Sequence, residues 1–414
     1  MHALRRVGLL LVLVPLIADA CTGSAKAVTI GALYPTSGTQ GTGGTQELRG
    51  VQLAVEWANA HGGLHGRHIR LVQSDASRAE AVPAAMRALV ARGATVVVGS
   101  HGSAISAAAA AVAERDRVSF WETGAVGQID QGSPTGRNFF RLAPMGANLG
   151  QAAISFVRDQ LAAKLPRHPA RYGVAFVNDA YGRAVAQGAI DEINRSGMTL
   201  AGTFPYDGAT TDFSPIAAHV SAARPDVLFA AAYLDDGVGL RQALVAAHVP
   251  LLAGIGTSSS FCMPDFGARL GGDAVGLFAS DKPDDTVLRP SALRPEGRKL
   301  LSWASSKYRA RWHTEMSAAA LSGFSNAYAL FVHVLPASTD LRPASVAAAA
   351  LHVKLAEGSL PNGGGLDLAP PGAPDAGANQ RSAGVIEEWV APKTREVVWP
   401  PAFATHPVVA LPLS

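Results

Sequence analysis

Short apolar runs alternate with amphipathic stretches after residue 27. Four runs rich in β-branched and aromatic residues predict strands at 28–34, 69–72, 95–98 and 118–121. Between them, apolar residues recur at helical spacing and predict helices at 47–59, 82–92 and 103–115. Strands that alternate with helices of this length form βαβ crossovers, so this half of the chain predicts a parallel sheet covered by helices.

The same alternation starts again at residue 147. Helices are predicted at 147–163, 180–195, 213–222 and 237–247, and strands at 172–177, 200–204, 226–231 and 251–255. The two runs share an order of elements but no sequence repeat that aligns. This indicates two similar lobes rather than a solenoid.

The last third of the chain predicts segments that return to these lobes. A connection with three prolines at 282–296 precedes helices at about 294–308, 318–334 and 343–356, a loop at 360–378, and strands at 383–390 and 396–399. We therefore expect a hinge of several crossing strands. The expected boundaries are 28–145 plus about 280–340 for the first lobe, and 146–279 plus about 341–405 for the second.

Residues 1–27 have the features of an export signal. Arg5 and Arg6 precede an apolar run at 7–17, which is too short to span a bilayer as a mature helix. Ala20 directly before Cys21 is typical of a lipoprotein signal, and Asp19 departs from that pattern. Small residues before 21 and before 28 also suit ordinary cleavage, so lipidation of Cys21 and plain secretion both stay open.

Composition narrows the class of protein. The chain has 414 residues, of which 48% are hydrophobic and 16% charged, so it is long enough for two folded domains and too apolar for a disordered chain. The net charge is +3 and basic residues are scattered, which argues against a nucleic-acid partner. Two cysteines exclude a disulfide scaffold, and an isolated Cys262 is expected to be a buried small side chain.

Known motifs for catalysis and cofactors are missing from the sequence. The glycines at 38–44 lack both the dinucleotide spacing and a phosphate-binding lysine, and there is no G-x-S-x-G elbow. His61, His65 and His68 lie across a glycine-rich turn and are expected to form a surface cluster. We therefore expect no metal, no cofactor and no enzymatic activity.

Segments in both lobes and at the C-terminus carry a family pattern. They are 30–38 (IGALYPTSG), 50–54 (GVQLA), 59–63 (NAHGG) with Gly66-Arg67 and Asp75, 96–99 (VVVG) with Ser103, 178–182 (NDAYG), 224–226 (RPD), 379–381 (NQR), Trp389 and Trp399-Pro400. In this order, from about 28 to 401, they resemble the type I periplasmic binding proteins. The most similar group is the leucine/isoleucine/valine-binding solute receptors of ABC importers.

The resemblance implies an α/β protein of two Rossmann-like lobes, with parallel-rich sheets joined by a multi-strand hinge. The lobes of this venus-flytrap would close on a small-molecule ligand in the cleft between them. It further implies an extracytoplasmic location in a bacterium and an ABC permease as partner. The membrane would be a partner through a lipid if Cys21 is modified.

Candidate ligand-binding residues follow the strand ends of both lobes. Ser103 begins a helix, where its hydroxyl and the free N–H groups suit a carboxylate or carbonyl oxygen. The resemblance adds Trp121, Glu122 and Thr123 after the fourth strand, and Tyr181, Tyr233, Gly256 and Thr257 in the second lobe. Trp121 departs from the small residue usual in the family and is expected either to narrow the pocket or to pack in the core.

The sequence departs from the family where an acid would hold an α-amino group. Residues 254–258 (GIGTS) carry no charge there. Glu122, Asp179 or Asp235 is a substitute for that acid; otherwise the ligand is neutral or anionic, for example an amide, a urea-like molecule or an organic acid. Two other functions stay open: a ligand-sensing subunit of a membrane signalling protein, and a secreted hydrolase-like enzyme that uses Ser103.

Overall fold

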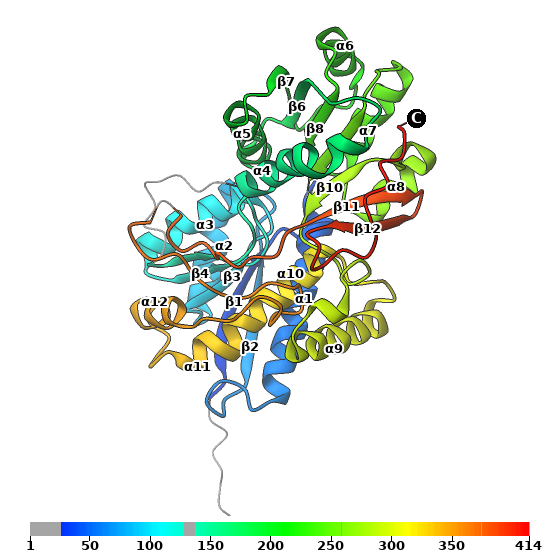
Figure 1. Cartoon of the computed structure of the whole chain (residues 1–414). Helices are drawn as coiled ribbons and strands as arrows, with labels where there is room; N and C mark the ends of the chain where they lie inside the picture. The colour runs from blue at the N-terminus through cyan, green and yellow to red at the C-terminus, as the bar shows by residue number, and fades with distance from the viewer. Residues whose placement is uncertain (1–25, 128–136, 258, 374, 414) are drawn as a thin grey trace, which may run out of the picture.

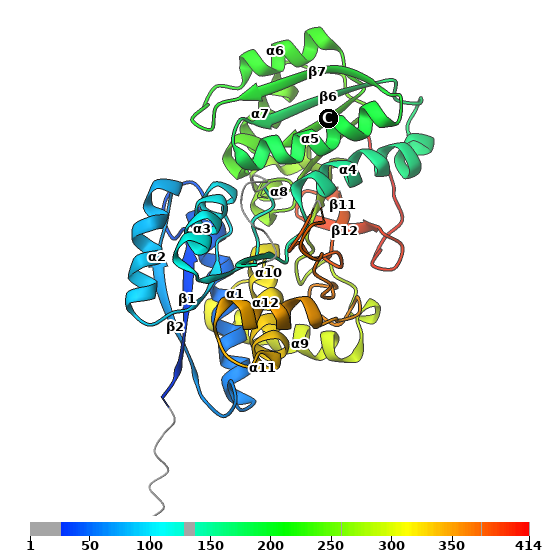
Figure 2. The ribbon, with the colours of Figure 1, turned by 90° about the vertical axis from the view of Figure 1, so that its left-hand side faces the viewer.

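The computed structural model describes residues 26–127, 137–257, 259–373 and 375–413, which form two lobes (Figure 1). Blue and cyan strands with yellow and orange helices make the first lobe, and the green segments with the red C-terminal strands make the second (Figures 1 and 2). Each lobe is a sheet covered by helices, which confirms the predicted fold class.

The first lobe contains a five-stranded parallel sheet in the order β2-β1-β3-β4-β5. Its strands are β1 (Val28–Tyr34), β2 (Ile69–Asp75), β3 (Val96–Gly99), β4 (Ser119–Glu122) and β5 (Phe139–Arg141). Its first helices are α1 (Gly41–Ala60), the short η1 (Ala79–Ala81), α2 (Val82–Ala91) and α3 (Ser103–Asp116). Residues 35–40, 100–102 and 123–127 follow β1, β3 and β4, so these loops lie at the carboxyl end of the sheet.

Alternation along these strands builds two cores, one on each face of the sheet. Leu33, Val97 and Phe120 pack against α2 and α3. Their chain neighbours Val98 and Trp121 pack on the other face, against α1 and the later helices. Both faces are apolar, as a parallel sheet between two helical layers requires.

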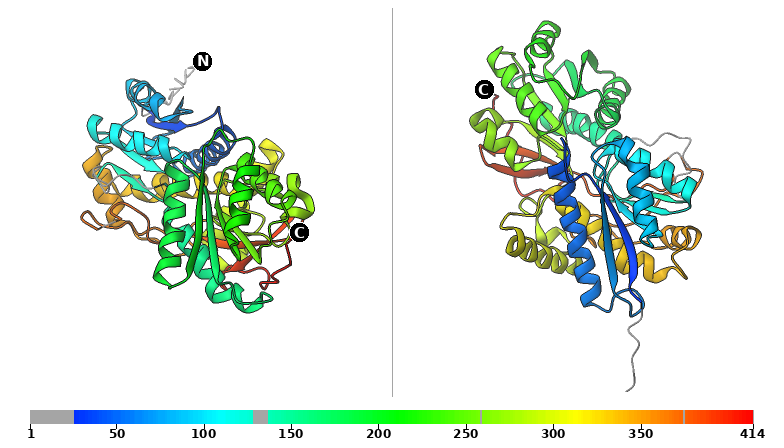
Figure 3. Two further views of the ribbon diagram at one scale, coloured as in Figure 1. Left: turned by 90° about the horizontal axis from the view of Figure 1, so that it is seen from above. Right: turned by 180° about the vertical axis from the view of Figure 1, so that it is seen from behind.

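The second lobe contains a seven-stranded mixed sheet in the order β12-β11-β10-β9-β8-β6-β7. Five strands are parallel: β6 (Arg171–Val177), β7 (Thr199–Tyr206), β8 (Val227–Ala231), β9 (Ala253–Thr257) and β10 (Phe278–Asp281). The hairpin β11 (Val385–Ala391) and β12 (Thr394–Trp399) joins β10 in antiparallel pairing. Figure 3 shows this red hairpin beside the yellow-green strands in both views.

Helices cover both faces of the second sheet. They are α4 (Gly146–Phe156), η2 (Val157–Leu161), η3 (Ala162–Lys164), α5 (Ala180–Arg195), α6 (Ser214–Ala223), α7 (Leu234–Ala246), α8 (Pro264–Leu270) and η4 (Gly271–Ala274). Asp179 caps α5, where its Oδ1 accepts a hydrogen bond from the Gly182 N–H at 2.8 Å.

The later helices return to the first lobe. They are η5 (Pro290–Ala292), α9 (Pro295–Trp312), α10 (Ala318–Tyr328), η6 (Ala329–Val334), α11 (Leu335–Ala337) and α12 (Pro343–His352). The segment Ala318–Ala337 is long and apolar enough to cross a membrane, yet 78% of its apolar window is buried inside the protein, as expected of a core helix. It packs along α1, where a Cβ on Gly50 would lie 2.0 Å from the Ala320 carbonyl oxygen.

One predicted boundary is wrong. Residues from about 341 to 405 were expected in the second lobe, but Val346, Ala350, Leu360 and Leu368 are buried in the core of the first. Helix α12 packs against η6 and β4 of the first lobe, and the hairpin β11–β12 continues into the second lobe.

The chain passes between the lobes at 142–145, 282–289 and 379–384. The first and third passages run side by side, since Arg141 bridges to Ala378 and the Asn379 N–H donates to the Arg141 carbonyl at 2.8 Å. The sequence predicted several crossing strands between the lobes, but these three passages contain no named strand and are irregular segments.

We predict that Gly50→Ala destabilises the protein. The added Cβ would meet backbone atoms of Ala320 and Phe324, which cannot move as a side chain can. We expect the free energy of unfolding to fall by roughly 1–3 kcal/mol in urea titrations, although alanine is the better helix former. Gly272→Ala is the control, because a Cβ there meets nothing within 4 Å. Equal stability of the two variants would contradict the close α1–α10 packing.

Candidate functional site

An inter-lobe cleft of about 910 Å³ lies between the carboxyl ends of strands from both sheets. The first lobe lines it with the loop after β1, the start of α1, His101 and the start of α10. The second lobe lines it with segments after β6, β7, β8, β9 and β10. Ligand sites of open α/β sheets lie at this end of the strands.

A small pocket of about 10 Å³ adjoins the cleft and has room for one water-sized group. Ser103, Gly102 and Gly124 line it from the first lobe, and Tyr181 lines it from the second. Five further residues line both the small pocket and the cleft: Gln40, His101, Tyr233, Ser259 and Lys282. The two spaces therefore form one continuous site.

Ser103 lies in the small pocket as predicted, in the first turn of α3. The helix cap is Gly102, and no side chain caps the first N–H groups. The Ser103 hydroxyl oxygen accepts the Gly127 N–H at 2.9 Å. A hydroxyl that accepts one hydrogen bond can still donate its own hydrogen, which suits a ligand oxygen.

Thr123 supports this wall from behind and lines neither space. It is fully buried, and its hydroxyl donates to the Glu47 carboxylate at 2.5 Å. Tyr34 lies 2.6 Å away through its hydroxyl, and burial and the nearby Glu47 raise the pKa of Tyr34 well above its ordinary value. Tyr34 therefore stays a proton donor, and Thr123 is engaged with the protein rather than facing a ligand.

Glu47 and His101 complete the same wall. The Glu47 carboxylate is fully buried on α1 and lies 2.8 Å from the His101 Nδ1. The imidazole ring reaches both the cleft and the small pocket. Helix α10 passes so close to Glu47 that only a glycine, Gly323, fits opposite its carbonyl oxygen. The sequence interpretation did not single out Glu47, because an acid on an amphipathic helix is usually at the surface.

Glu122 and Trp121 were predicted at the ligand site, and the structure contradicts both. The Glu122 carboxylate is buried below the strand ends, where it accepts N–H hydrogen bonds from Ser100, Gly124 and Ala125 at 2.7–3.1 Å and one from the Ser106 hydroxyl. Burial and the charge of Glu47 raise the pKa of Glu122, and the hydrogen bonds from Gly124 and Ala125 offset only part of that rise. It holds the loops and does not replace the missing ammonium-binding acid.

Trp121 lies in the core instead. Its side chain is 1% exposed, packs against Phe140, and donates its indole N–H to the Asn326 carbonyl at 2.9 Å. The alternation of β4 turns Trp121 toward α10 and away from the cleft, which is the core-packing alternative that the sequence left open.

Tyr181 and Tyr233 lie together on the wall of the second lobe, as predicted. Their ring centroids are 5.1 Å apart. The Tyr233 hydroxyl donates to Asp179 Oδ2 at 2.8 Å and accepts from the Gln40 amide at 3.1 Å. Because Gln40 belongs to the first lobe, this second hydrogen bond spans the cleft.

Gly256 and Thr257 were predicted to face the ligand, and they face the protein interior instead. A Cβ on Gly256 would lie 2.2 Å from the Phe261 ring. Thr257 is fully buried, with its hydroxyl 3.0 Å from the Tyr181 hydroxyl. Neither lines the cleft or the small pocket, so they position an aromatic ring and Tyr181.

The charged groups of the cleft are mostly engaged. Asp179 caps α5 and accepts from Tyr233, and Asp235 pairs with Arg269 at 2.5 Å in an exposed position. Lys282 was missed by the sequence interpretation. It follows β10, a strand of four residues that ends in two polar ones, and its Nζ donates to the Gly124 carbonyl of the first lobe at 2.9 Å.

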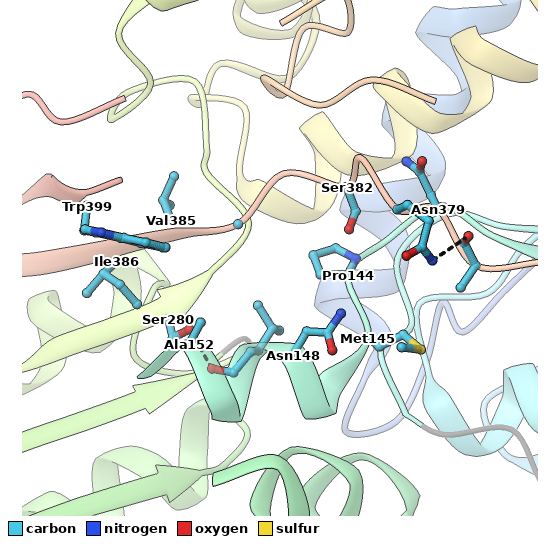
Figure 4. Close-up of a pocket in the computed structure, with 14 residues that line it drawn as sticks. Pro144, Met145, Asn148, Ala152, Ser280, Asn379, Ser382, Val385, Ile386 and Trp399 are labelled. Carbon is cyan, nitrogen blue, oxygen red and sulfur yellow. Dashed lines mark hydrogen bonds between the residues drawn. The ribbon is translucent and has the colours of Figure 1, made fainter. Parts of the chain in front are cut away.

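A separate hinge cavity of about 210 Å³ is lined by the first and third passages and by α4 (Figure 4). Pro144, Met145, Ser382 and Trp399 surround it, and it shares no lining residue with the cleft. The end of β10 separates the two spaces. Ser280 lines the hinge cavity and donates to the Leu149 carbonyl at 2.9 Å, whereas the next residue, Asp281, lines the cleft.

Nothing in the described ranges forms a metal centre, since they hold no group of three or more His, Cys, Asp or Glu side chains placed to bind an ion. Cys21 lies outside the described residues. Cys262 is buried, as expected, with its thiol 2.6 Å from Asp281 Oδ2.

Comparison with known proteins agrees with this geometry. Residues 27–372 match the family model of the periplasmic binding proteins. The chain belongs to the periplasmic binding protein family. A Leu/Ile/Val-binding protein homolog from Brucella suis is 27% identical over 360 residues, covering 85% of this chain and 87% of the relative.

Solved structures show the same fold. The branched-chain amino acid transporter substrate-binding protein LivJ of Streptococcus pneumoniae, in complex with isoleucine, has a TM-score of 0.73 at 18% identity, over 90% of this chain and all of that one. A solute-binding protein of an ABC transporter from R. palustris, in complex with benzoate, has a TM-score of 0.72 at 17% identity, over 93% and 99% of the two chains.

Family membership assigns a periplasmic solute-binding role and an extracytoplasmic location. The relatives are binding proteins and not enzymes, so the hydrolase alternative is dropped.

We predict that Trp121→Ala lowers the free energy of unfolding by about 3–5 kcal/mol in urea titrations, because it leaves a cavity in the first-lobe core that Trp121 shares with α10. Trp312→Ala, at a partly exposed position, should cost much less. Ligand affinity of the folded variant should change less than threefold. A Trp121→Ala variant that keeps the wild-type stability but loses ligand affinity would show that Trp121 contacts the ligand.

Proposed function

We propose that this protein is the substrate-binding component of an ABC importer and that it closes its two lobes on a small polar organic ligand in the inter-lobe cleft. The observation that carries this is the hydrogen bond from Gln40 to Tyr233, which links the two walls of a cleft large enough for such a ligand. This hydrogen bond needs a group from each lobe, so it favours the closed form. A ligand that contacts both walls also shifts the population toward the closed form.

Several ligand classes agree with the site: a branched-chain amino acid, an amide or urea-like molecule, or an organic acid. LivJ is described with isoleucine and the R. palustris protein with benzoate. Both of those ligands carry a carboxylate, and only isoleucine carries an ammonium. The partner is an ABC permease, which receives the ligand from the closed form.

The first experiment is a thermal-shift screen of the purified protein against these compound classes. A ligand at a hundredfold excess over its Kd stabilises the folded state by about 2.7 kcal/mol and raises Tm. Small-angle X-ray scattering with a compound that raises Tm should then show a smaller radius of gyration. No Tm shift with any class, or binding without compaction, would contradict the proposal.

Tyr233→Phe tests the link between the lobes. The variant keeps the ring and loses the hydrogen bonds to Gln40 and Asp179, so we expect Kd to rise about tenfold, equivalent to about 1.4 kcal/mol. Tyr172→Phe is the matched control, because Tyr172 is buried at the opposite end of β6 from the cleft. Isothermal titration should show the rise for the first variant alone, and equal affinities would remove Tyr233 from the site.

We also propose that Cys21 carries a lipid that anchors the exported protein to the membrane. The basic residues, the apolar run and Ala20 before the cysteine support it. Metabolic labelling with a fatty-acid analogue should mark the wild-type protein and leave Cys21→Ser unlabelled and released. Labelling that persists in the variant, or a wild-type protein found free of the membrane, would favour plain secretion.

A further inference from the structure

The hinge cavity is large enough for a small organic molecule. Its volume is about 210 Å³. An engineered apolar cavity of about 150 Å³ holds benzene. The hinge cavity therefore has room for a ring or a short branched chain with one polar group attached.

The cavity has an apolar side and a polar side. Figure 4 shows Trp399, Ile386 and Val385 on one side, and Asn148 and Ser382 on the other. Ile386 and Val385 are almost fully buried, whereas Ser382 is half-buried and Asn148 is exposed. A molecule that fits this space has an apolar body that points inward and a polar group that points outward.

Hydrogen-bonding capacity follows the same division. Ser280 lies among the buried residues of the cavity, and its hydroxyl already donates to the Leu149 carbonyl at 2.9 Å. On the polar side, the Asn148 amide and the Ser382 hydroxyl make no hydrogen bond to the described part of the chain. The groups with free capacity are therefore those at the outer side of the cavity.

The lining of the cavity selects against charge. Among the described residues that line it, none is acidic or basic. A charged group placed there would lose water and gain no ionic partner, which is costly. Amide and hydroxyl side chains suit a neutral polar group, and the face of an indole such as Trp399 suits a ring or a hydrocarbon chain.

The cavity and the cleft lie on opposite faces of the second sheet at the end of β10. Successive side chains of a strand point to opposite faces, and here Ser280 lines the cavity whereas Asp281 lines the cleft. The lobes are held in the position in which Gln40 donates to Tyr233 across the cleft. A rotation about the passages that widens the cleft on one face narrows the space on the other.

We infer that the hinge cavity is a second binding site, for a small neutral molecule with an apolar body and one hydroxyl or amide group, and that its occupant favours the closed lobes. The apolar body packs against Trp399 and Ile386, and the polar group reaches Asn148 and Ser382. A molecule seated there resists the rotation that opens the cleft, so it raises the affinity for the solute. Solute in the cleft raises the affinity of the hinge site by the same factor. The site itself goes beyond the proposed function, and its effect on solute affinity rests on that function.

Matched pairs of compounds test the chemistry of the cavity. Benzyl alcohol is compared with benzylamine, and 3-methylbutan-1-ol with 3-methylbutylamine, because each pair exchanges a hydroxyl for an ammonium on one skeleton. Ligand-observed NMR titration of the solute-free protein should give at least one alcohol a Kd at least tenfold lower than that of its amine. Alcohols that do not bind, or amines that displace them at equal concentration, would overturn the inference.

The variant Ala152→Leu locates the bound alcohol. Ala152 lines the cavity from α4, so a leucine there would occupy the space, and we expect the Kd of the alcohol to rise at least tenfold. Ala147→Leu is the matched control, since Ala147 is exposed on the same helix and does not line the cavity. If Ala152→Leu does not fold, Ser382→Leu fills the cavity from the third passage. An alcohol that binds the filled variant as tightly as the wild type lies elsewhere, and the site would then be wrong.

The effect on the cleft is measured separately. A saturating concentration of the alcohol should lower the Kd of the solute found in the thermal-shift screen about fivefold in the wild type and leave it unchanged in Ala152→Leu, each protein being compared with itself. Small-angle X-ray scattering of the solute-free protein should show a smaller radius of gyration with the alcohol than without it. An alcohol that binds in the cavity and causes neither change would overturn the coupling. A protein that binds the alcohol but no compound of the wider screen would overturn the proposed function and leave the hinge site in place.

Discussion

Two carboxylates taken out of water hold the first-lobe wall of the cleft in one shape. The Glu47 carboxylate hydrogen-bonds Thr123 and His101, and the Glu122 carboxylate accepts hydrogen bonds from N–H groups of the loops at 100 and 124–125. A buried charge is tolerated only with several well-placed donors, and these donors lie on loops that regular secondary structure does not order. The wall is therefore pre-organised, and a ligand does not have to order it on binding.

The second lobe is organised differently. Its wall is an aromatic pair, with Tyr181 supported by Thr257 and Tyr233 supported by Asp179. Each lobe has its own hydrophobic cores, so the closure proposed above would concentrate its backbone changes in the three passages between them. Polar groups that lie on opposite lobes, such as Gln40 and Tyr233 or Gly124 and Lys282, form hydrogen bonds only in a particular relative position of the lobes.

The sequence predicted the parts that depend on periodicity. The alternation of strands and helices predicted two parallel-rich lobes. The position after the third strand predicted Ser103 on the site wall, and the family resemblance predicted Tyr181 and Tyr233 there. What it could not predict depends on packing between distant segments. Trp121 and Glu122 end β4. Trp121 is oriented by α10, which lies about 200 residues later, and Glu122 is held by N–H groups of the loops at 100 and 124–125. Lys282 was missed because β10 has only four residues and resembles a connection. The place of α12 depends on its packing against η6 and β4, which no local pattern reveals.

The hinge cavity shares no residue with the ligand site, although both depend on the position of the lobes. For a protein that binds by closing, the apparent Kd of every ligand is scaled by the fraction of closed-competent molecules. A change of side-chain volume at Ala152 or Ser382 would alter that fraction and leave every ligand contact as it is. Natural selection can therefore adjust the nutrient concentration at which such a receptor is half-saturated separately from the choice of nutrient.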